Sequence, residues 1–223
     1  MNRPSTDEGA RRQTPALSLR VVTDRLVLRP PRTSDVPEVR RALRANAAHL
    51  RPWSVATGPD EDPASLVSVS QAVLAHRRDW KRGRAFVLMI TSRDDESRVI
   101  GRVALAGVLR GAFQNAYLGY WIDEGHQGRG LMTEAVWAAT SFAFGTARLH
   151  RVQAAVMPRN EASLRVLAKV GYRREGFALK YLCIAGAWED HWLFAVTSEE
   201  WVAGNGEVMS PSCGTPPLLS ERG

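Results

Sequence analysis

The sequence predicts a mixed α/β (α+β) domain with a mainly antiparallel central sheet and flanking helices. Short apolar stretches that alternate like strands are interleaved with longer segments that have helical spacing. Short turns join two pairs of these strands, around residues 93–96 and 185–186, as expected for hairpins. A single strand–helix–strand segment over 115–156 supplies one crossover. Together these observations indicate one mixed, mainly antiparallel sheet with a single crossover.

The strands are predicted from alternating or β-branched runs that end at turn residues. Proline closes the first run, and glycine follows or separates several others. The expected strands are residues 20–29, 84–92, 99–109, 115–122, 149–156, 172–184 and 187–196.

The helices are predicted from their end signals. Thr33 or Ser34 caps a helix that runs to about Leu50. Asp62-Pro63 opens a second helix ending near Arg82, because proline at the first turn loses no hydrogen bond. A third helix follows a glycine turn and covers about 132–144, and a short fourth covers 161–170 before Gly171.

Composition sets the domain organisation. The 223 residues are 44% hydrophobic, so a sizeable core is expected. We expect a flexible tail at 1–19, a domain at 20–202 and a disordered Gly/Pro/Ser-rich tail at 203–223. Residues 1–20 lack the apolar segment of a secretory signal, and no run of 18 apolar residues occurs.

The cysteines bear on the redox compartment of the protein, and its charge bears on its binding partners. Cys183 and Cys213 form neither a disulfide framework nor a metal-binding spacing, which favours a reducing cytoplasm and no metal. The lack of a long apolar run leads us to expect no membrane partner. The net charge is +7 and the pI is about 10.1. The arginine-rich run at 77–84 is suited to RNA phosphates, an acidic protein or cofactor phosphates, or it is a solvated helix end.

The most informative motif is the glycine turn at 127–132, Gln-Gly-Arg-Gly-Leu-Met, between an aromatic strand and a helix. Its glycines let the backbone approach a ligand closely. The first helical N–H groups lack intrahelical partners and face the same point. A strand that turns through two glycines into a helix is therefore a candidate phosphate cradle.

A second motif lies about thirty residues later. Asn160, Ser163 and Gly171-Tyr172 give the pattern Asn-x-x-Ser…Gly-Tyr. Together with the glycine turn, this resembles the GNAT superfamily of acetyl-CoA-dependent N-acetyltransferases. Within it the chain looks most like the RimJ/RimL branch, which acetylates α-amino groups of ribosomal proteins. Further segments fit this branch: 23–30, 50–53, 150–152, 181–182 and 186–191.

The resemblance implies a GNAT fold with a splayed strand pair that receives acetyl-CoA. Its pantetheine arm would lie between the strands that end at Ile122 and Val156, and its pyrophosphate would meet the glycine turn. The cosubstrate residues implied are Trp121, Ile122, Gln127, Gly128, Arg129, Gly130, Leu131, Met132 and Asn160.

The resemblance also implies direct attack of the amine on the thioester. Many GNAT enzymes carry a tyrosine as the acid at the position of Leu167, which cannot serve. In the RimJ/RimL pattern the serine takes this role, which implies Ser163 as the donor to the leaving sulfur. The alternative is a first-turn helix serine bonded to the backbone.

Two carboxylates are candidates for the general base, Glu124 just past a strand and Asp190 between two tryptophans. Asp190 is equally suited to a salt bridge or to binding the substrate ammonium. His126 and His150 are interpreted as structural. An α-amino group has a pKa of roughly 7.7–8.0, so about a tenth is neutral at pH 7 and only a weak base is needed.

Trp53 and Tyr181 are the expected acceptor-binding residues, with core packing the alternative for Trp53. The expected partner is a protein N-terminus, most simply the N-terminal alanine of a ribosomal protein, with possible contact to ribosomal RNA. A monomer and a homodimer both fit. The alternatives are an enzyme for a small amine, such as an aminoglycoside or polyamine, and a ribosome-assembly or RNA-binding factor with secondary transferase activity.

Overall fold

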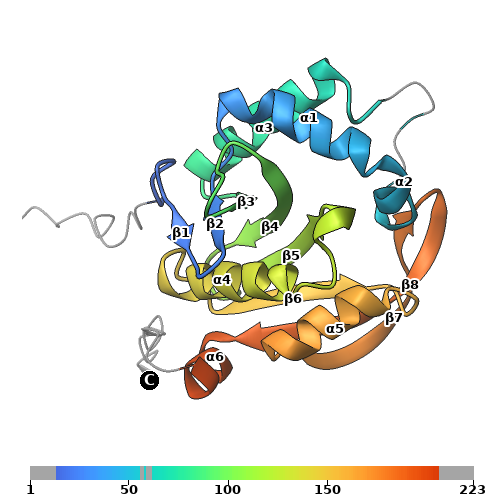
Figure 1. The fold of residues 1–223 in the computed structure, drawn as a ribbon. Helices are drawn as coiled ribbons and strands as arrows, with labels where there is room; N and C mark the ends of the chain where they lie inside the picture. Colours follow the sequence, from blue (N-terminus) through green and yellow to red (C-terminus); the bar gives the residue numbers. More distant parts are fainter. Residues whose placement is uncertain (1–13, 56–57, 59–61, 206–223) are drawn as a thin grey trace, which may run out of the picture.

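The computed structural model describes residues 14–55, 58 and 62–205, and these form a mixed α/β fold (Figure 1). The sheet has eight strands in the order β1-β2-β3-β4-β5-β6-β8-β7, and every neighbouring pair is antiparallel except β5–β6. The predicted fold class is therefore confirmed. The strands are β1 (Val21–Val22), β2 (Leu26–Arg29), β3 (Phe86–Ser92), β4 (Val99–Leu109), β5 (Asn115–Ile122), β6 (Arg151–Val156), β7 (Arg173–Ile184) and β8 (Ala187–Thr197).

Helices pack on both faces of the sheet (Figure 1). Residues alternate between faces along a strand, so β3 contributes to two cores. Val87 and Met89 pack in a small cluster with residues of α1 and α3, and Phe86 and Leu88 belong to the main core with α4. The helices are α1 (Val36–Ala45), α2 (Ala47–Leu50), α3 (Leu66–Lys81), α4 (Leu131–Gly145), α5 (Glu161–Val170) and α6 (Ser198–Asn205), with 3₁₀ turns η1 (Thr33–Asp35), η2 (Arg51–Trp53) and η3 (Glu124–His126).

The two parallel strands separate after three residues. β5 pairs with β6 only from Asn115↔Arg151 to Tyr117↔Gln153. Beyond that point β5 stays paired with β4 as far as Ile122, and β6 stays paired with β8 as far as Val156. The carboxyl ends of β5 and β6 are thus unpaired with one another, which confirms the splayed strand pair.

The prediction of one strand over residues 20–29 is wrong, because this segment forms two short strands, β1 and β2. A turn at Thr23–Arg25 folds β1 back onto β2. The Thr23 hydroxyl and the Arg25 N–H both donate to Glu134 Oε1, at 2.6 and 3.0 Å. A carboxylate from α4 therefore fixes a turn that has no glycine or proline.

The predicted first helix, 33–50, is also interrupted. Asn46 leaves the helical conformation (φ −106°, ψ 11°) between α1 and α2. Its buried side chain donates to Asp123 Oδ2 at 2.9 Å and accepts from the Glu124 N–H at 2.8 Å. The break therefore ties α1 and α2 to the loop that follows β5.

The second predicted helix begins later than expected. Ser65, rather than Asp62-Pro63, caps α3, and its hydroxyl accepts from the Ser68 N–H at 3.1 Å. Asp62 instead accepts from the Ala64 N–H in the preceding turn. Ser65 has the extended backbone that an N-cap requires (φ −65°, ψ 154°), and so the helix begins after Ser65 rather than at Pro63.

The predicted tails lie partly outside the described residues, namely at 1–13 and 206–223. Within the described part, Leu17 and Leu19 pack against the main core, and the buried Trp80 donates from its indole nitrogen to Pro15 O at 2.6 Å. The chain also forms α6 after β8, which the sequence analysis did not assign to an element.

Candidate active site

A cavity of about 710 Å³ lies beside the unpaired end of β5, between α2, α4 and α5. It brings together residues from three segments that are far apart in the sequence, 49–53, 120–133 and 160–169. Of the residues expected at the site, those lining it are Trp53, Trp121, Ile122, Gln127, Gly128, Gly130, Leu131, Met132, Asn160 and Ser163.

The glycine turn forms one wall of this cavity. Gly128 (φ 73°) and Gly130 (φ 75°) adopt the left-handed conformation, which other residues enter only with strain. Gly130 is the N-cap of α4, so the free N–H groups and the positive dipole end of the helix lie at the cavity wall. This geometry fits the pyrophosphate of a nucleotide-like cosubstrate.

An ion pair locks the turn to the amino-terminal hairpin. Arg25 binds Glu134, in the first turn of α4, through Nε at 2.7 Å and Nη2 at 2.6 Å. Arg25 Nη1 also donates to the Arg129 carbonyl at 2.9 Å. Burial alone would raise the pKa of Glu134, but the hydrogen bonds from Thr23 and Arg25 outweigh it and lower that pKa. Glu134 therefore stays ionised and holds the cradle in shape.

Arg129 differs from the other expected cosubstrate residues. Its side chain is exposed, and it is not among the residues that line the cavity. Gln127 does line it, and its amide nitrogen lies 2.6 Å from His49 Nε2. His49, on α2, is a lining residue that the sequence analysis missed.

Ser163 is hydrogen-bonded to a tyrosine at the wall of the cavity. The Tyr120 hydroxyl oxygen lies 2.7 Å from Ser163 Oγ and 3.3 Å from the Ser163 carbonyl oxygen. Asn160 Oδ1 accepts from the Ser163 N–H at 3.1 Å and so caps α5. Asn160 holds the backbone of Ser163 while Tyr120 holds its hydroxyl.

Tyr120 is the second residue that the sequence analysis missed. Burial raises the pKa of Tyr120 to about 12, against the opposing hydrogen bond with Ser163. The phenol is therefore protonated at neutral pH and has a proton to donate. Its only sequence signal is its place in β5, two residues before Ile122, which puts both side chains on the same face.

The two carboxylates predicted as bases lie outside the cavity lining. Glu124 is exposed in η3, next to the lining residue His126, and its N–H is held by Asn46. Asp190 accepts from the Lys180 N–H at 2.7 Å, where a bulge interrupts the pairing of β7 with β8. Of the described residues that line the cavity, none is Asp or Glu.

Trp53 stands where η2 meets the tip of the β7–β8 hairpin. The Arg159 guanidinium lies 5.3 Å from the Trp53 ring centre and pairs with Glu189 at 2.6 Å. The Ala185 N–H donates to Ser54 O at 2.9 Å. In Figure 1 this hairpin lies beside α2. The Trp53 ring and its neighbour Ser54 are thus each held by a contact from another segment, and Trp53 lines the cavity.

Tyr181 lies on the same hairpin but is not among the lining residues. Its ring is 37% exposed and packs edge-on against His191, with ring centres 5.7 Å apart. The expected contact of Tyr181 with an acceptor therefore stays a prediction.

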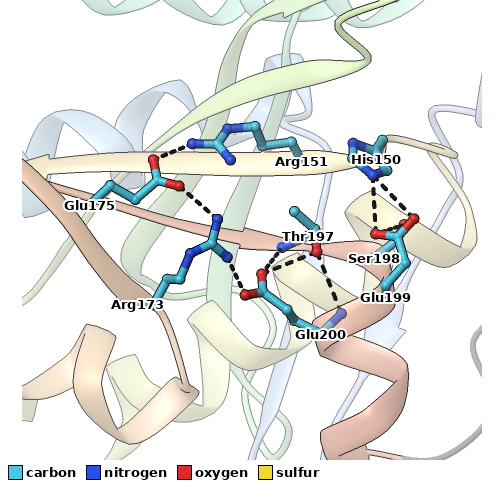
Figure 2. A network of polar contacts seen from close by, with 8 residues as sticks. All are labelled: His150, Arg151, Arg173, Glu175, Thr197, Ser198, Glu199 and Glu200. Atoms are coloured by element: carbon cyan, nitrogen blue, oxygen red, sulfur yellow. Dashed lines mark hydrogen bonds and ion pairs between the residues drawn. The ribbon is translucent and has the colours of Figure 1, made fainter.

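The two histidines interpreted as structural have different surroundings. His150 pairs with Glu199 at 3.0 Å in a polar network that joins α6 to the sheet (Figure 2). In the same network Arg173 bridges Glu175 and Glu200, and Glu200 accepts from the Thr197 N–H (Figure 2). His126, by contrast, lines the cavity and contacts Asp123 Oδ1 at 3.1 Å.

Among residues 14–55, 58 and 62–205, no group of three or more His, Cys, Asp or Glu side chains is placed to hold a metal ion. In the same described part of the chain, no helix is both long enough and apolar enough to cross a membrane.

Comparison with known proteins agrees with this geometry. The acetyltransferase (GNAT) domain model matches residues 25–173. The chain is 37% identical to the [ribosomal protein uS5]-alanine N-acetyltransferase of Escherichia coli (strain K12) over 188 residues, which are 83% of this chain and 94% of that protein. Over 112 residues it is 46% identical to YjcK of Bacillus subtilis (strain 168), covering 50% of this chain and 61% of that protein.

Solved structures give the same result. The ribosomal-protein-S5-alanine acetyltransferase of Vibrio fischeri superposes with a TM-score of 0.76 at 32% identity, covering 82% of this chain and 98% of that chain. Mycobacterium smegmatis RimJ, solved in complex with CoA-disulfide, superposes with a TM-score of 0.74 at 33% identity, covering 81% and 89%. The splayed strands, the glycine turn and these matches establish that the chain belongs to the GNAT family of N-acetyltransferases.

Proposed function

We propose that the protein transfers acetyl from acetyl-CoA to the α-amino group of a protein N-terminus, with the N-terminal alanine of a ribosomal protein as the acceptor. The observation that carries the proposal is the cavity itself. It joins a helix N-terminus suited to pyrophosphate with a paired Ser163 and Tyr120. The named activities of the E. coli and V. fischeri relatives support the acceptor class.

In the proposed reaction the neutral amine attacks the thioester carbonyl carbon. The N–C bond forms, the C–S bond breaks, and the departing sulfur carries the negative charge. The Ser163 hydroxyl donates a proton to this sulfur and regains one through Tyr120, whose hydroxyl oxygen lies 2.7 Å from Ser163 Oγ. In this proposal Tyr120 is the donor of that hydrogen bond, which leaves the serine proton free to point into the cavity.

The ammonium form of the acceptor must lose one proton before attack, and the nitrogen must lose a second proton as the amide forms. Asp190 is engaged with the Lys180 N–H, whereas Glu124 is exposed beside His126 at the cavity edge. We therefore assign Glu124 as the base, acting through water, and Asp190 a role in shaping the hairpin. A weak, water-mediated base suffices because roughly a tenth of an α-amine is already neutral at pH 7.

The acceptor is proposed to enter between η2 and the β7–β8 hairpin. Trp53, held by Arg159, would contact the side chain of the first residue of the acceptor. Tyr181 would contact later residues of the acceptor from the hairpin. The enzyme acts in the cytoplasm in this proposal, where ribosomal proteins are made, and contact of the arginine-rich 77–84 segment with ribosomal RNA stays a prediction.

A small polycationic amine is a weaker candidate for the acceptor. Such substrates are recognised by carboxylates, and the described lining of the cavity contains neither Asp nor Glu. Its charged groups are Arg165 and Lys169, which repel a polycation.

The proposal is tested by release of free CoA thiol with a panel of acceptors. The panel holds peptides beginning with Ala, Ser or Met, an α-blocked lysine peptide and an aminoglycoside. Turnover that requires a free α-amine and is fastest with Ala is expected. Turnover confined to the lysine peptide or the aminoglycoside would refute the acceptor class. An assembly factor would be favoured if no acceptor is acetylated and if the protein binds RNA equally well with and without the Ser163 hydroxyl.

A further inference from the structure

β4 carries an arginine that has no counter-charge. Arg102 lies between Met89 of β3 and Trp121 of β5, so its backbone is covered on both sides. Its Nε atom is buried without a hydrogen-bond partner. Burial lowers the pKa of Arg102, and no Asp or Glu in the described part of the chain pairs with the guanidinium to oppose this effect. A buried guanidinium is normally paired, so Arg102 is an exception that needs a reason.

Arg29 shows what a buried arginine of this fold requires. It makes two hydrogen bonds of 2.8 Å with the Asp35 carboxylate. The charge of Arg102 instead reaches His76, and together with burial it lowers the pKa of that imidazole to about 4. His76 is therefore neutral at pH 7 and offers no anion. The place that Asp35 takes beside Arg29 is left to a ligand beside Arg102.

The guanidinium of Arg102 is reachable from the side of the cavity. Its Nη atoms also lack partners but are not fully buried. Trp121, its cross-strand neighbour on the same face of the sheet, lines the cavity. The next pair on this face is Ala104 with Gly119, where a Cβ added to the glycine would meet no heavy atom within 4 Å. Open sheet surface therefore adjoins both Trp121 and the guanidinium.

We infer that Arg102 binds an acidic side chain of the acceptor, close to its amino terminus. This deepens the proposed function and rests on a protein N-terminus as the acceptor. A planar guanidinium matches a carboxylate through two parallel N–H···O bonds, as Arg29 and Asp35 show within this chain. In a protein acceptor, Asp and Glu side chains supply such carboxylates. The enzyme would then select N-termini by a nearby acid as well as by the first residue.

The inference predicts a preference among peptides that differ at one position. Ala-initiated peptides carry Glu, Asp or Gln in turn at positions two to five, and kcat/KM is measured for each. At one of these positions an acid should raise kcat/KM about tenfold over Gln, as expected for a hydrogen bond between charged groups. Arg102→Met should abolish this ratio by slowing the acidic peptide, and Arg102→Lys should retain part of it.

Urea unfolding separates binding from a structural role. Since its guanidinium is unpaired without acceptor, Arg102→Met should be at least as stable as wild type. Arg78→Met is the matched control, because Arg78 is exposed on α3 outside the cavity lining, and it should keep the acid preference.

Three results overturn the inference but leave the proposed acceptor intact. They are equal turnover of acidic and Gln peptides by wild type, an acid preference that survives Arg102→Met, and a marked loss of stability in Arg102→Met, which would assign Arg102 to the fold. Absence of turnover with every one of these peptides overturns both proposals.

Discussion

Tyr120 and Ser163 place two hydroxyl oxygens 2.7 Å apart at the wall of the cavity, although 43 residues separate them in the chain. The tyrosine comes from β5 and the serine from the first turn of α5. Each hydroxyl can donate and accept, so the pair forms a short relay that ends at the position proposed for the leaving sulfur.

Loss of the Ser163 hydroxyl should slow the chemical step more than it weakens binding. Ser163→Ala should lower kcat by about a hundredfold, the contribution expected of a general acid, with a small effect on the KM for acetyl-CoA. Tyr120→Phe should cost about fivefold, since it removes one hydrogen bond. Steady-state kinetics with an Ala-initiated peptide measures both.

Ser163→Thr is the control, since it keeps a hydroxyl and should retain part of the activity. If both Ser163→Ala and Ser163→Thr keep the kcat of the wild type, the Ser163 hydroxyl donates no proton in the rate-limiting step.

The glycine turn should be sensitive to a single methyl group. Gly130→Ala forces alanine to φ 75°, at a cost of about 1–2 kcal/mol, or displaces the turn. We expect about a tenfold rise in the KM for acetyl-CoA from loss of close backbone approach. Gly111→Ala is a matched control, because Gly111 has φ 72° and open space around it but lies outside the cavity lining. Equal KM effects of the two variants would contradict the cradle.

The parts of this fold that the sequence predicts are those with local signals. The turn at Gly128 and Gly130 is encoded by the glycines themselves. The break at Asn46 is not local, because its side chain is held by Asp123 and Glu124, 77 and 78 residues away. The helix propensity of asparagine therefore could not predict the break, because the partners of Asn46 come together only in the folded chain.

The same distinction applies to the candidate site. The motif gave Asn160 and Ser163, whereas Tyr120 and His49 line the cavity only because β5 and α2 are brought to it by long-range packing. Glu124 and Asp190 were expected from their chain positions, but which way a carboxylate points depends on its tertiary partners. Lys180, at φ 46° in the β7 bulge, supplied that partner for Asp190.

Removal of one partner from the buried ion pair of Arg29 and Asp35 should strongly destabilise the protein. Arg29 and Asp35 are 2% and 6% exposed, and two hydrogen bonds of 2.8 Å join them. Asp35→Ala leaves a buried guanidinium unpaired and should cost about 3–5 kcal/mol of unfolding free energy. The exposed pair of Glu161 with Arg165 supplies the comparison, since Glu161→Ala should cost about 0–1 kcal/mol. Urea unfolding measures the free energy of unfolding of both variants. Similar losses in Asp35→Ala and Glu161→Ala would contradict the burial of the Arg29–Asp35 pair.

His76 should make the protein sensitive to acid. Burial, followed by the charge of Arg102, lowers the pKa of His76 to about 4, against the opposing effect of Asp79. The unfolded chain therefore takes up this proton first, near its ordinary pKa of roughly 6.5. The contribution to stability is complete above pH 6.5 and is lost as the pH falls toward 4.

The measurement is the unfolding free energy at pH 7.5 and pH 4.5 for wild type and His76→Gln. The glutamine variant should lose less stability between these values than wild type does. An identical pH dependence in both proteins would mean that His76 titrates normally in the folded state.

The proposed reaction transfers acetyl to the α-amine of a ribosomal protein. To test it, ribosomal proteins that lack N-terminal acetylation are incubated with the enzyme and acetyl-CoA, and the added acetyl groups are mapped by mass spectrometry. We expect one acetyl on the α-amine of a protein that begins with alanine, and a strong reduction with Ser163→Ala. Acetyl groups found only on lysine side chains, or no acetylation of any ribosomal protein, would refute the proposed reaction.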